Sequence, residues 1–210
     1  MSSAAPISVL LTAFEPYDRW STNASWEALV ALTRELPTSP RVVTRRYPVD
    51  FAKTRSKLAD DLAANYDYAI HLGQAPGSAS IHLEAVALNV AGEIAQSPDD
   101  FSAIVPGGPV AYRTALPLAA WAAKIRAAGI PAQVSYHAGT YLCNAILYLA
   151  QHFAVERGLK TQAAFVHLPL SPEQVLAERH DVASLPTAHA AEALRLIFGE
   201  LNQPAATYLA

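Results

Sequence analysis

Short apolar runs alternate along this chain with longer segments in which apolar residues recur at helical spacing. The short runs are rich in Val and Ile, as is typical of strands buried within a sheet. Helical segments separate most of these runs, and such alternation is typical of successive βα units. The pattern therefore predicts an α/β fold in which helices pack on a sheet.

The predicted elements follow from this periodicity and from the turn-forming residues between them. The strands are Ile7–Thr12, Arg41–Tyr47, Tyr68–Leu72, Ile81–Val90, Gln133–Tyr136 and Ala163–Leu168. The helices are Ser25–Leu36, Asp50–Asn65, Pro117–Ala128, Thr140–Phe153, Ser171–Glu178 and Ala188–Leu201. We expect one domain over residues 1–210, with three α/β/α layers around a twisted, mostly parallel (mixed) sheet.

One helix start carries a recognisable capping signal. The sequence Ser171-Pro172-Glu173-Gln174 offers a capping serine, a proline at the first helical position and a glutamine that can reach back to the cap. We therefore expect a helix to begin at this point.

Composition narrows the class of protein further. The chain has 210 residues, of which 52% are hydrophobic and 16% charged, so it can bury a large core and is neither disordered nor a coiled-coil rod. The net charge is −3, and the densest basic group is the short set Arg41, Arg45 and Arg46. Binding to nucleic acid through phosphate neutralisation is therefore not expected.

The cellular setting is predicted from cysteine content and hydropathy. The single cysteine, Cys143, excludes an intrachain disulfide, and the start Met1–Pro6 lacks the cationic segment of a signal peptide. No apolar run approaches the roughly 18 to 20 residues that span a bilayer, because Lys124 and Arg126 interrupt the longest candidate. We expect a cytoplasmic protein with no membrane association.

Cys143 is the first candidate for chemistry. It follows a predicted strand and a glycine turn, and Thr140 is placed to cap the next helix, so Cys143 falls in the first helical turn. Free N–H groups and the positive end of the helix dipole favour a thiolate there, and the same N–H groups can hold a developing oxyanion. The alternative is a buried structural cysteine, since free cysteines are among the most buried residues.

A nucleophilic cysteine needs an imidazole within reach, and the chain offers seven histidines. His152 lies nine positions after Cys143, on the opposite side of the predicted helix, and is expected at the surface; His180 and His189 flank a polar loop and are expected to meet solvent. His167 instead ends a buried strand. Carboxyl ends of strands face the binding crevice in open α/β sheets, so His167 and Cys143 are expected to meet there. The alternative is a hydrogen-bonded core histidine.

Glu84 is a carboxylate in an otherwise apolar strand. Alternation places it on one face with Val86 and Leu88, so it is expected to be partly buried. A buried carboxylate needs a partner, and Glu84 can orient an imidazole. The alternative is a glutamate at a strand edge in water.

Metal and nucleotide sites are not predicted. The triplet His82-Leu83-Glu84 is superficially similar to that of zinc deaminases, which need two or three cysteines where this chain has one. The glycines near residues 73–77 and 107–108 are not followed by the Lys-Ser/Thr of a phosphate loop. The irregular segment Asp99–Pro109 is either a lid or a surface loop.

Four stretches, taken in order, resemble one known family. They are Leu11–Tyr17 with Asn23–Ala28; Gly73-Gln74-Ala75 leading to Leu83-Glu84 and Val86–Asn89; Ala138–Asn144; and Phe165–Pro169 with Pro172-Glu173-Gln174. Their order and spacing are similar to those of the pyroglutamyl-peptidase I (pyrrolidone-carboxylate peptidase) family of cysteine peptidases. The resemblance covers nearly the whole chain.

The resemblance implies an activity and three catalytic roles. Cys143 would be the nucleophile, His167 the general base and acid, and Glu84 the carboxylate that orients His167. Enzymes of this family hydrolyse the amide bond after an N-terminal pyroglutamyl residue of peptides through a thioester. They need no cofactor and are typically cytosolic homo-oligomers, which implies a dimer or tetramer here.

The resemblance also implies how the acyl group is bound. A pyroglutamyl ring is a lactam without a free amine, so its pocket needs flat apolar walls and a few hydrogen bonds rather than a carboxylate. Phe14, Tyr17, Tyr141 and Leu142 correspond to the pocket positions, and Gln74 to the polar contacts with the ring amide. Ordinary core packing is the alternative reading of each aromatic residue alone.

The chain departs from the family pattern in its cationic residues. The family commonly places an arginine after the catalytic glutamate, where this chain has Ala85, and a second arginine near the oxyanion. No Lys or Arg occurs between Lys57 and Arg113, so neither can be recovered by realignment. Loss of an oxyanion donor can cost about 10²- to 10³-fold in rate. The alternative function is therefore a homologue with altered acyl specificity, or one that binds without efficient turnover, unless His82, His137 or Arg113 substitutes.

Overall fold

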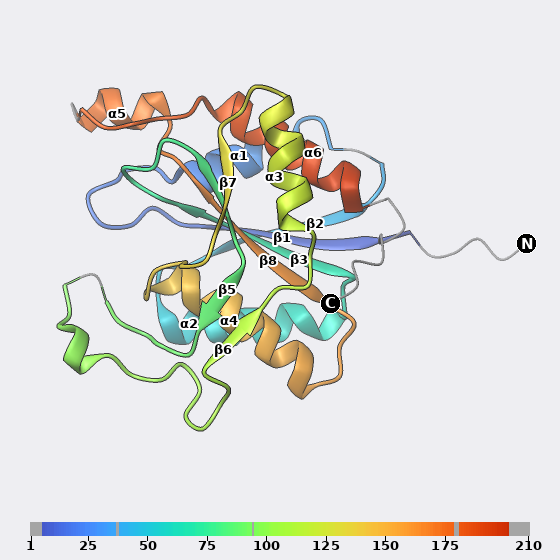
Figure 1. Ribbon diagram of the computed structural model, residues 1–210, viewed down its shortest axis with the longest axis vertical. Helices are drawn as coiled ribbons and strands as arrows, with labels where there is room; N and C mark the ends of the chain where they lie inside the picture. The colour runs from blue at the N-terminus through green and yellow to red at the C-terminus, as the bar shows by residue number, and fades with distance from the viewer. Residues whose placement is uncertain (1–5, 37, 94, 179–180, 202–210) are drawn as a thin grey trace, which may run out of the picture.

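The computed structural model describes residues 6–36, 38–93, 95–178 and 181–201, and they form an α/β fold (Figure 1). The main sheet contains β1 (Ser8–Phe14), β2 (Arg41–Tyr47), β3 (Tyr68–Gln74), β4 (Ile81–Glu84), β7 (Ala132–Ser135) and β8 (Gln162–Leu168). The helices are α1 (Ala24–Thr33), α2 (Phe51–Asp61), α3 (Leu118–Ala127), α4 (Leu142–Glu156), α5 (Pro172–Glu178) and α6 (Thr187–Leu201). Short 3₁₀ turns, η1 (Leu62–Ala64) and η2 (Pro98–Asp100), and a hairpin of β5 (Val86–Leu88) and β6 (Ala111–Arg113) complete the chain.

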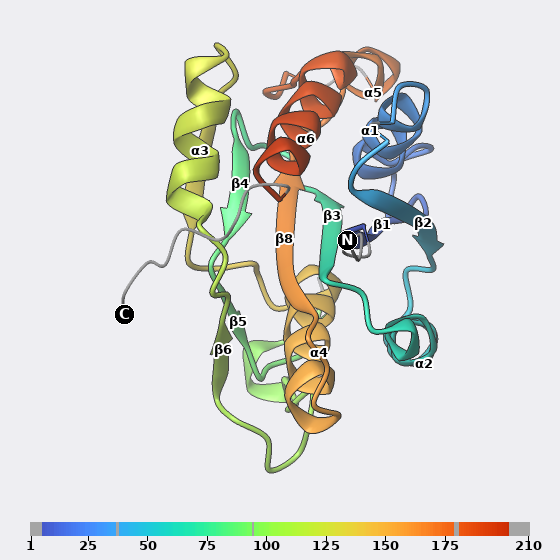
Figure 2. The ribbon, with the colours of Figure 1, turned by 90° about the vertical axis from the view of Figure 1, so that its right-hand side faces the viewer.

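The layers agree with the predicted α/β/α arrangement. Helices α1, α3 and α6 cover one face of the sheet, and α2 and α4 cover the other, as Figures 1 and 2 show from two directions. Each face has its own apolar core: Trp121 and Phe198 belong to the first, Tyr148 and Phe165 to the second, and all four are almost fully buried. Burial of each such side chain contributes about 1.5 to 3 kcal/mol of transfer free energy, which holds the helices against the sheet.

The strand directions in the sheet are mixed, with parallel pairs in the majority. The order is β2-β1-β3-β8-β4-β7. All neighbouring pairs are parallel except β4 and β8, which run antiparallel with His82 opposite His167. The mostly parallel, mixed sheet was therefore predicted correctly, and the one reversal brings the histidine of β8 beside β4.

The predicted single strand Ile81–Val90 is wrong, because the chain divides at Ala85. The Ala85 N–H still donates to the Ser135 carbonyl of β7 (2.7 Å), whereas its own carbonyl accepts from Thr114 beyond β6 (3.0 Å). Strand β4 thus belongs to the main sheet and β5 to the hairpin with β6. The continuous apolar pattern gives no sign of this change of partner. It also gives no sign of β6, three mostly exposed residues.

Helix starts were predicted with different success. The capping box at Ser171 is present: its N–H donates to Gln174 Oε1 (3.0 Å), and the Gln174 N–H donates to Ser171 Oγ (3.3 Å). The expected cap of α4 by Thr140 is wrong, since the N-cap is Tyr141 and no side chain caps that end. The Thr140 carbonyl instead accepts from the Gly92 N–H (2.8 Å), which holds Thr140 outside the helix.

Three histidines were predicted to lie at the surface and not in the site, and the structure describes two of them. His189 is exposed, as predicted, and His180 lies outside the described residues. His152 was expected at the surface, but its side chain is only 15% exposed and its Nδ1 contacts the Tyr112 hydroxyl at 3.0 Å. The β5–β6 hairpin packs on that side of α4, which the helical wheel alone cannot show. Among the described residues, no helix is both long and apolar enough to cross a membrane.

Candidate active site

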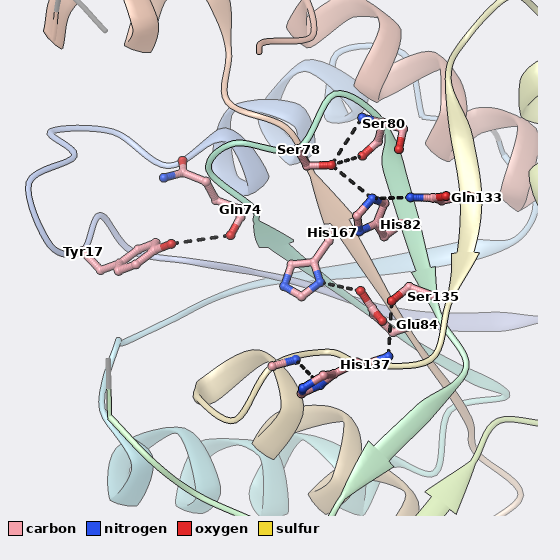
Figure 3. Close-up of polar contacts among 11 residues, drawn as sticks. Tyr17, Gln74, Ser78, Ser80, His82, Glu84, Gln133, Ser135, His137 and His167 are labelled. Atoms are coloured by element: carbon pink, nitrogen blue, oxygen red, sulfur yellow. Dashed lines mark hydrogen bonds and ion pairs between the residues drawn. The ribbon is translucent and has the colours of Figure 1, made fainter. Parts of the chain in front are cut away.

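Glu84 and His167 form the centre of the site (Figure 3). Glu84 is the last residue of β4, and His167 is the penultimate residue of β8. Because the strands are antiparallel, Glu84 lies diagonally across from His167 on the same face of the sheet. His167 Nδ1 and Glu84 Oε1 are 2.7 Å apart, and the Glu84 side chain is buried. The geometry therefore excludes a glutamate in water and leaves the other His167 nitrogen for a second partner.

Cys143 is the second group that acts on this imidazole, through its charge and a hydrogen bond. It is the second residue of α4, it is half-buried, and it lines one cavity together with His167. Gly73 makes its position possible: a Cβ there would lie 2.5 Å from the Phe165 ring and 3.0 Å from Cys143 Sγ. Gly73 is also paired with His167 across β3 and β8. The absent side chain at this point leaves the space that the sulfur and the imidazole share.

The electrostatics favour a charged imidazole. Burial acts to lower the pKa of His167, but the charge and hydrogen bond of Cys143, followed by those of Glu84, raise it to about 10. Burial acts to raise the pKa of Glu84, and the hydrogen bond and charge of His167, together with the Ser135 hydroxyl, bring it below its ordinary value. The arrangement thus favours the imidazolium form of His167 and the carboxylate form of Glu84.

The route by which Cys143 and His167 meet differs from the prediction. We expected both to lie at the carboxyl ends of strands along one edge of the sheet. In the structure β7 runs parallel to β4 and therefore antiparallel to β8, so its carboxyl end does not lie at the edge where β8 ends. The loop of residues 136–141 instead leads from β7 to the start of α4 on the α2/α4 face of the sheet.

The three proposed substitutes for the missing arginines lie in different places. His82 interacts with Glu84 and His167: burial and the charge of His167 lower the pKa of His82, against the charge of Glu84. Its Nε2 contacts Ser78 Oγ (3.1 Å) and Gln133 Nε2 (2.8 Å). His137 Nδ1 accepts from the Gly139 N–H (3.1 Å) in the loop before α4. Arg113 lines a separate groove and not this cavity.

A cavity of about 480 Å³ opens in front of Cys143 and His167. All five side chains predicted to bind the acyl group line it: Phe14, Tyr17, Gln74, Tyr141 and Leu142. Tyr141 is held by an edge contact with the Phe51 ring, whose centroid lies 5.2 Å away. Further residues that were not predicted from the sequence also line the cavity: Asn23, Val49, Gly92, Glu93, Gln96, Pro98 and Phe101. Most lie in loops without a periodic pattern, and only Asn23 lies within a recognised motif.

The segment 99–109 contributes to one wall of this cavity. Phe101 lines it, and a Cβ at Gly92 would overlap the Phe101 ring, so the two segments are in close contact. A backbone bridge between Ala91 and Ser102 and a hydrogen bond from Arg55 to the Ile104 carbonyl (3.0 Å) hold the segment in place. The segment is therefore part of the cavity wall.

Gln74 is the buried polar group of the cavity. Its Oε1 accepts from the Ala24 N–H (2.8 Å) and from Gln174 Nε2 (2.7 Å). Its Nε2 has no hydrogen-bond partner among the described residues. The Tyr17 hydroxyl lies nearby and donates weakly to the Gln74 main-chain carbonyl at 3.5 Å (Figure 3). Burial, and then the charge of Cys143, raise the pKa of Tyr17, so its hydroxyl stays protonated.

Within the ranges that the structure describes, no group of three or more His, Cys, Asp or Glu side chains is placed to hold a metal ion. The arrangement combines a half-buried thiol, an imidazole held by a buried carboxylate, and a cavity in front of both.

Known proteins are similar to this chain in sequence and in architecture. The sequence profile of pyroglutamyl peptidases matches residues 7–201. The chain belongs to this family. Among pyrrolidone-carboxylate peptidases, that of Pseudomonas fluorescens strain SBW25 is 39% identical over 85% of this chain and 86% of its own length, and that of Chromobacterium violaceum is 40% identical over 90% and 89%.

Solved structures of pyroglutamyl peptidases share the fold. The pyrrolidone carboxyl peptidase of Fervidobacterium islandicum superimposes with a TM-score of 0.87 at 35% identity, covering 93% of this chain and 98% of that one. An E192A mutant of the Pyrococcus furiosus enzyme gives 0.85 at 31%, covering 92% and 97%. The family resemblance of the four motifs is therefore confirmed, and the protein is a cysteine peptidase of the pyroglutamyl-peptidase type.

Proposed function

We propose that this protein hydrolyses the amide bond after an N-terminal pyroglutamyl residue, with Cys143 as nucleophile, His167 as base and acid, and Glu84 as the carboxylate that orients His167. One observation carries the proposal: His167 is bound to buried Glu84 and interacts with Cys143 at a cavity lined by aromatic groups and a buried amide. The relatives' name, pyrrolidone-carboxylate peptidase, supports the substrate class.

In the first half of the reaction, the Cys143 sulfur attacks the carbonyl carbon of the pyroglutamyl group. The resulting tetrahedral intermediate collapses when the carbon–nitrogen bond breaks, and the His167 imidazolium gives its proton to the departing amine. A thioester and a shortened peptide remain. Glu84 keeps Nδ1 of the ring occupied, so Nε2 faces the reacting atoms.

In the second half, water hydrolyses the thioester. Neutral His167 removes a proton from the water as its oxygen attacks the thioester carbon, and the carbon–sulfur bond breaks. Pyroglutamate leaves, and the proton on His167 restores the starting pair. This sequence needs no metal or cofactor because both proton transfers use the same imidazole.

Stabilisation of the oxyanion falls to the start of α4. The first N–H groups of a helix lack intrahelical partners, and Cys143 is in this first turn with no side chain capping the end. The absence of an arginine after Glu84 makes these N–H groups more important. We expect them to bind the oxygen of the tetrahedral intermediate.

The pyroglutamyl ring is proposed to enter between the aromatic walls. Phe14, Tyr17 and Tyr141 provide flat apolar surface, and Leu142 and Val49 complete it. The ring carbonyl would accept a hydrogen bond from Gln74 Nε2, the buried donor that lacks a protein partner. A ring that carries a carbonyl, as the pyroglutamyl lactam does, can pair with this donor.

A chromogenic pyroglutamyl amide tests the proposal. We expect hydrolysis by the wild-type protein, insensitivity to a metal chelator, and loss in Cys143→Ala, with an alanyl amide as the substrate control. Cleavage of other acyl amides alone would instead indicate altered specificity, and ligand binding without hydrolysis would indicate a non-catalytic homologue.

The proposal also covers the oligomeric state and the cellular location of the protein. We expect one domain over residues 1–210, in a cytoplasmic homo-oligomer, either a dimer or a tetramer, with peptides rather than nucleic acid or membranes as partners. The solution mass measured by light scattering checks the subunit number, and cell fractionation checks the location.

A further inference from the structure

The orientation of the Gln74 amide follows from a chain of hydrogen bonds that begins outside the cavity. A carboxamide has an oxygen that only accepts and an NH₂ group that only donates. Main-chain N–H groups only donate, so any carboxamide atom that binds one must be the oxygen. The directions in this chain can therefore be assigned one link at a time.

The first link is at the start of α5. The Ser171 N–H donates to Gln174 at 3.0 Å, so this Gln174 atom is its oxygen. The Gln174 NH₂ group is then directed the other way, where it donates to the Thr22 carbonyl (3.0 Å) and to Gln74 (2.7 Å). Gln174 is only 4% exposed, so water does not compete for these contacts.

The second link is at Gln74. The atom that accepts from Gln174 also accepts from the Ala24 N–H at 2.8 Å, so two independent donors identify it as Oε1. The remaining atom, Nε2, is a buried donor without a partner among the described residues. Leaving a buried donor unpaired is costly in general, and this one belongs to a residue that lines the cavity.

We propose that Gln174 is a positioning residue that holds the Gln74 NH₂ group toward the bound acyl ring and thereby makes the site selective for rings that carry a carbonyl. Gln174 does not line the cavity and touches no reacting atom; it acts through Gln74. The inference rests on the proposed function for the identity of the ring, but its test measures binding and not hydrolysis.

Two ring compounds isolate the carbonyl. In 3-oxocyclopentanecarboxamide a CH₂ group replaces the ring nitrogen of pyroglutamide and the ring carbonyl is kept. Cyclopentanecarboxamide lacks both the ring nitrogen and the ring carbonyl. We would titrate both into Cys143→Ala, followed by NMR. We expect the protein with Gln174 to prefer the ketone about tenfold, the difference that one good hydrogen bond makes.

The variants then test the positioning. Gln174→Met fills a similar volume without donors, and Gln174→Glu retains an acceptor for Ser171 but has no NH₂ for Gln74. We expect the tenfold preference to fall to about twofold or less in both, and KM for a pyroglutamyl amide to rise by a similar factor while kcat changes little. Glu173→Gln, an exposed neighbour on α5, controls for the change in charge and should retain the preference.

The outcomes separate this inference from the proposed function. Loss of the preference in folded Gln174 variants, verified by thermal unfolding, supports positioning even if the wild type hydrolyses no pyroglutamyl amide. Equal weakening of both ligands, an unchanged preference, or no preference in the protein with Gln174 would overturn it. If Gln174→Glu fails to fold, Gln174→Met alone decides.

Discussion

At the scale of single residues, the site depends on glycine at position 73, which has no Cβ atom. Gly73 lies between the Phe165 ring and the Cys143 sulfur, at distances that a Cβ cannot occupy. Neither a turn nor a positive φ requires glycine here, since Gly73 is an interior residue of β3. Glycine is required here because the Cys143 sulfur and the Phe165 ring both lie close to the main chain of β3.

Gly73→Ala should therefore damage activity and stability together. The new methyl group must displace Phe165 or Cys143, so we expect at least a hundredfold loss of kcat/KM and about 1 to 3 kcal/mol lower free energy of unfolding. Urea unfolding and initial rates measure the two. Gly199→Ala is the control, because its Cβ meets open space within α6, and it should stabilise by about 0.5 to 1 kcal/mol. Full activity in Gly73→Ala would contradict the proposed packing.

Glu84→Gln should shift the pH dependence of the reaction. It removes a charge that raises the pKa of His167, so the imidazolium, stable up to about pH 10 in the wild type, should lose its proton at lower pH. The basic limb of kcat/KM against pH is expected to move down by about one unit or more. Glu35→Gln, a surface change at a side chain 78% exposed, should leave the limb in place. An unmoved limb in Glu84→Gln would mean that Glu84 does not set the charge of His167.

At the scale of elements, the position of α4 decides where the sulfur lies. Asn144, the residue after Cys143, is fully buried and makes three hydrogen bonds, two to Leu88 of β5 and one to Val90 just beyond it. Its Oδ1 accepts from the Leu88 N–H (2.8 Å), and its Nδ2 donates to the carbonyls of Leu88 and Val90 (both 2.9 Å). The first turn of the helix is thereby fixed to the hairpin.

Substitution of Asn144 should weaken the attachment of α4 to the hairpin and lower the free energy of unfolding. Asn144→Ala leaves one donor and two acceptors buried without partners, and we expect about 2 to 4 kcal/mol lower free energy of unfolding. Asn144→Asp directs a carboxylate at two carbonyls, so its destabilisation should shrink as the pH falls and the carboxyl gains a proton that it can donate. Denaturant unfolding at pH 5 and pH 7 measures this. A pH-independent loss in Asn144→Asp would show that the two carbonyl contacts are unimportant.

The elements also show what the sequence can and cannot predict. Ranges such as Arg41–Tyr47 and the helix at Ser171 were predicted well, because local periodicity and capping chemistry determine them. The break at Ala85 was missed because it depends on which strand, β7 or β6, offers the next hydrogen bond. Cys143, His167 and Glu84 were found as candidates, but their meeting on one face depends on the antiparallel step between β4 and β8. The cavity residues from loops, such as Val49 and Phe101, carry no local signal.

At the scale of the whole molecule, a second buried histidine affects how stability depends on pH. His71 on β3 is fully buried; its Nδ1 contacts Thr12 Oγ1 at 2.8 Å, and its Nε2 has no partner among the described residues. Burial lowers its pKa to about 3. The unfolded chain takes up this proton near pH 6.5 and the folded protein does not, so the free energy of unfolding falls as the pH drops below 6.5.

His71→Asn should remove this dependence. The amide can still contact Thr12 and does not titrate, so the difference in unfolding free energy between wild type and variant should change by up to about 1.4 kcal/mol per pH unit between pH 6 and pH 4. The raised pKa of His167 acts in the opposite sense, with stability lost as the pH rises toward 10, and it cancels in this comparison. His189→Asn, at an exposed position, should give parallel curves. Parallel curves for His71→Asn would mean that its imidazole is protonated in the folded state.

The antiparallel pairing of β8 with β4 has a consequence for the folding of the enzyme. Glu84 and His167 are 83 residues apart in the chain, and their contact exists only once a late strand has docked against an early one in the opposite direction. A nascent chain that has not yet been synthesised as far as β8 does not contain His167. During refolding, hydrolysis should therefore begin only when β8 has paired with β4. The recovery of activity would then report completion of the sheet.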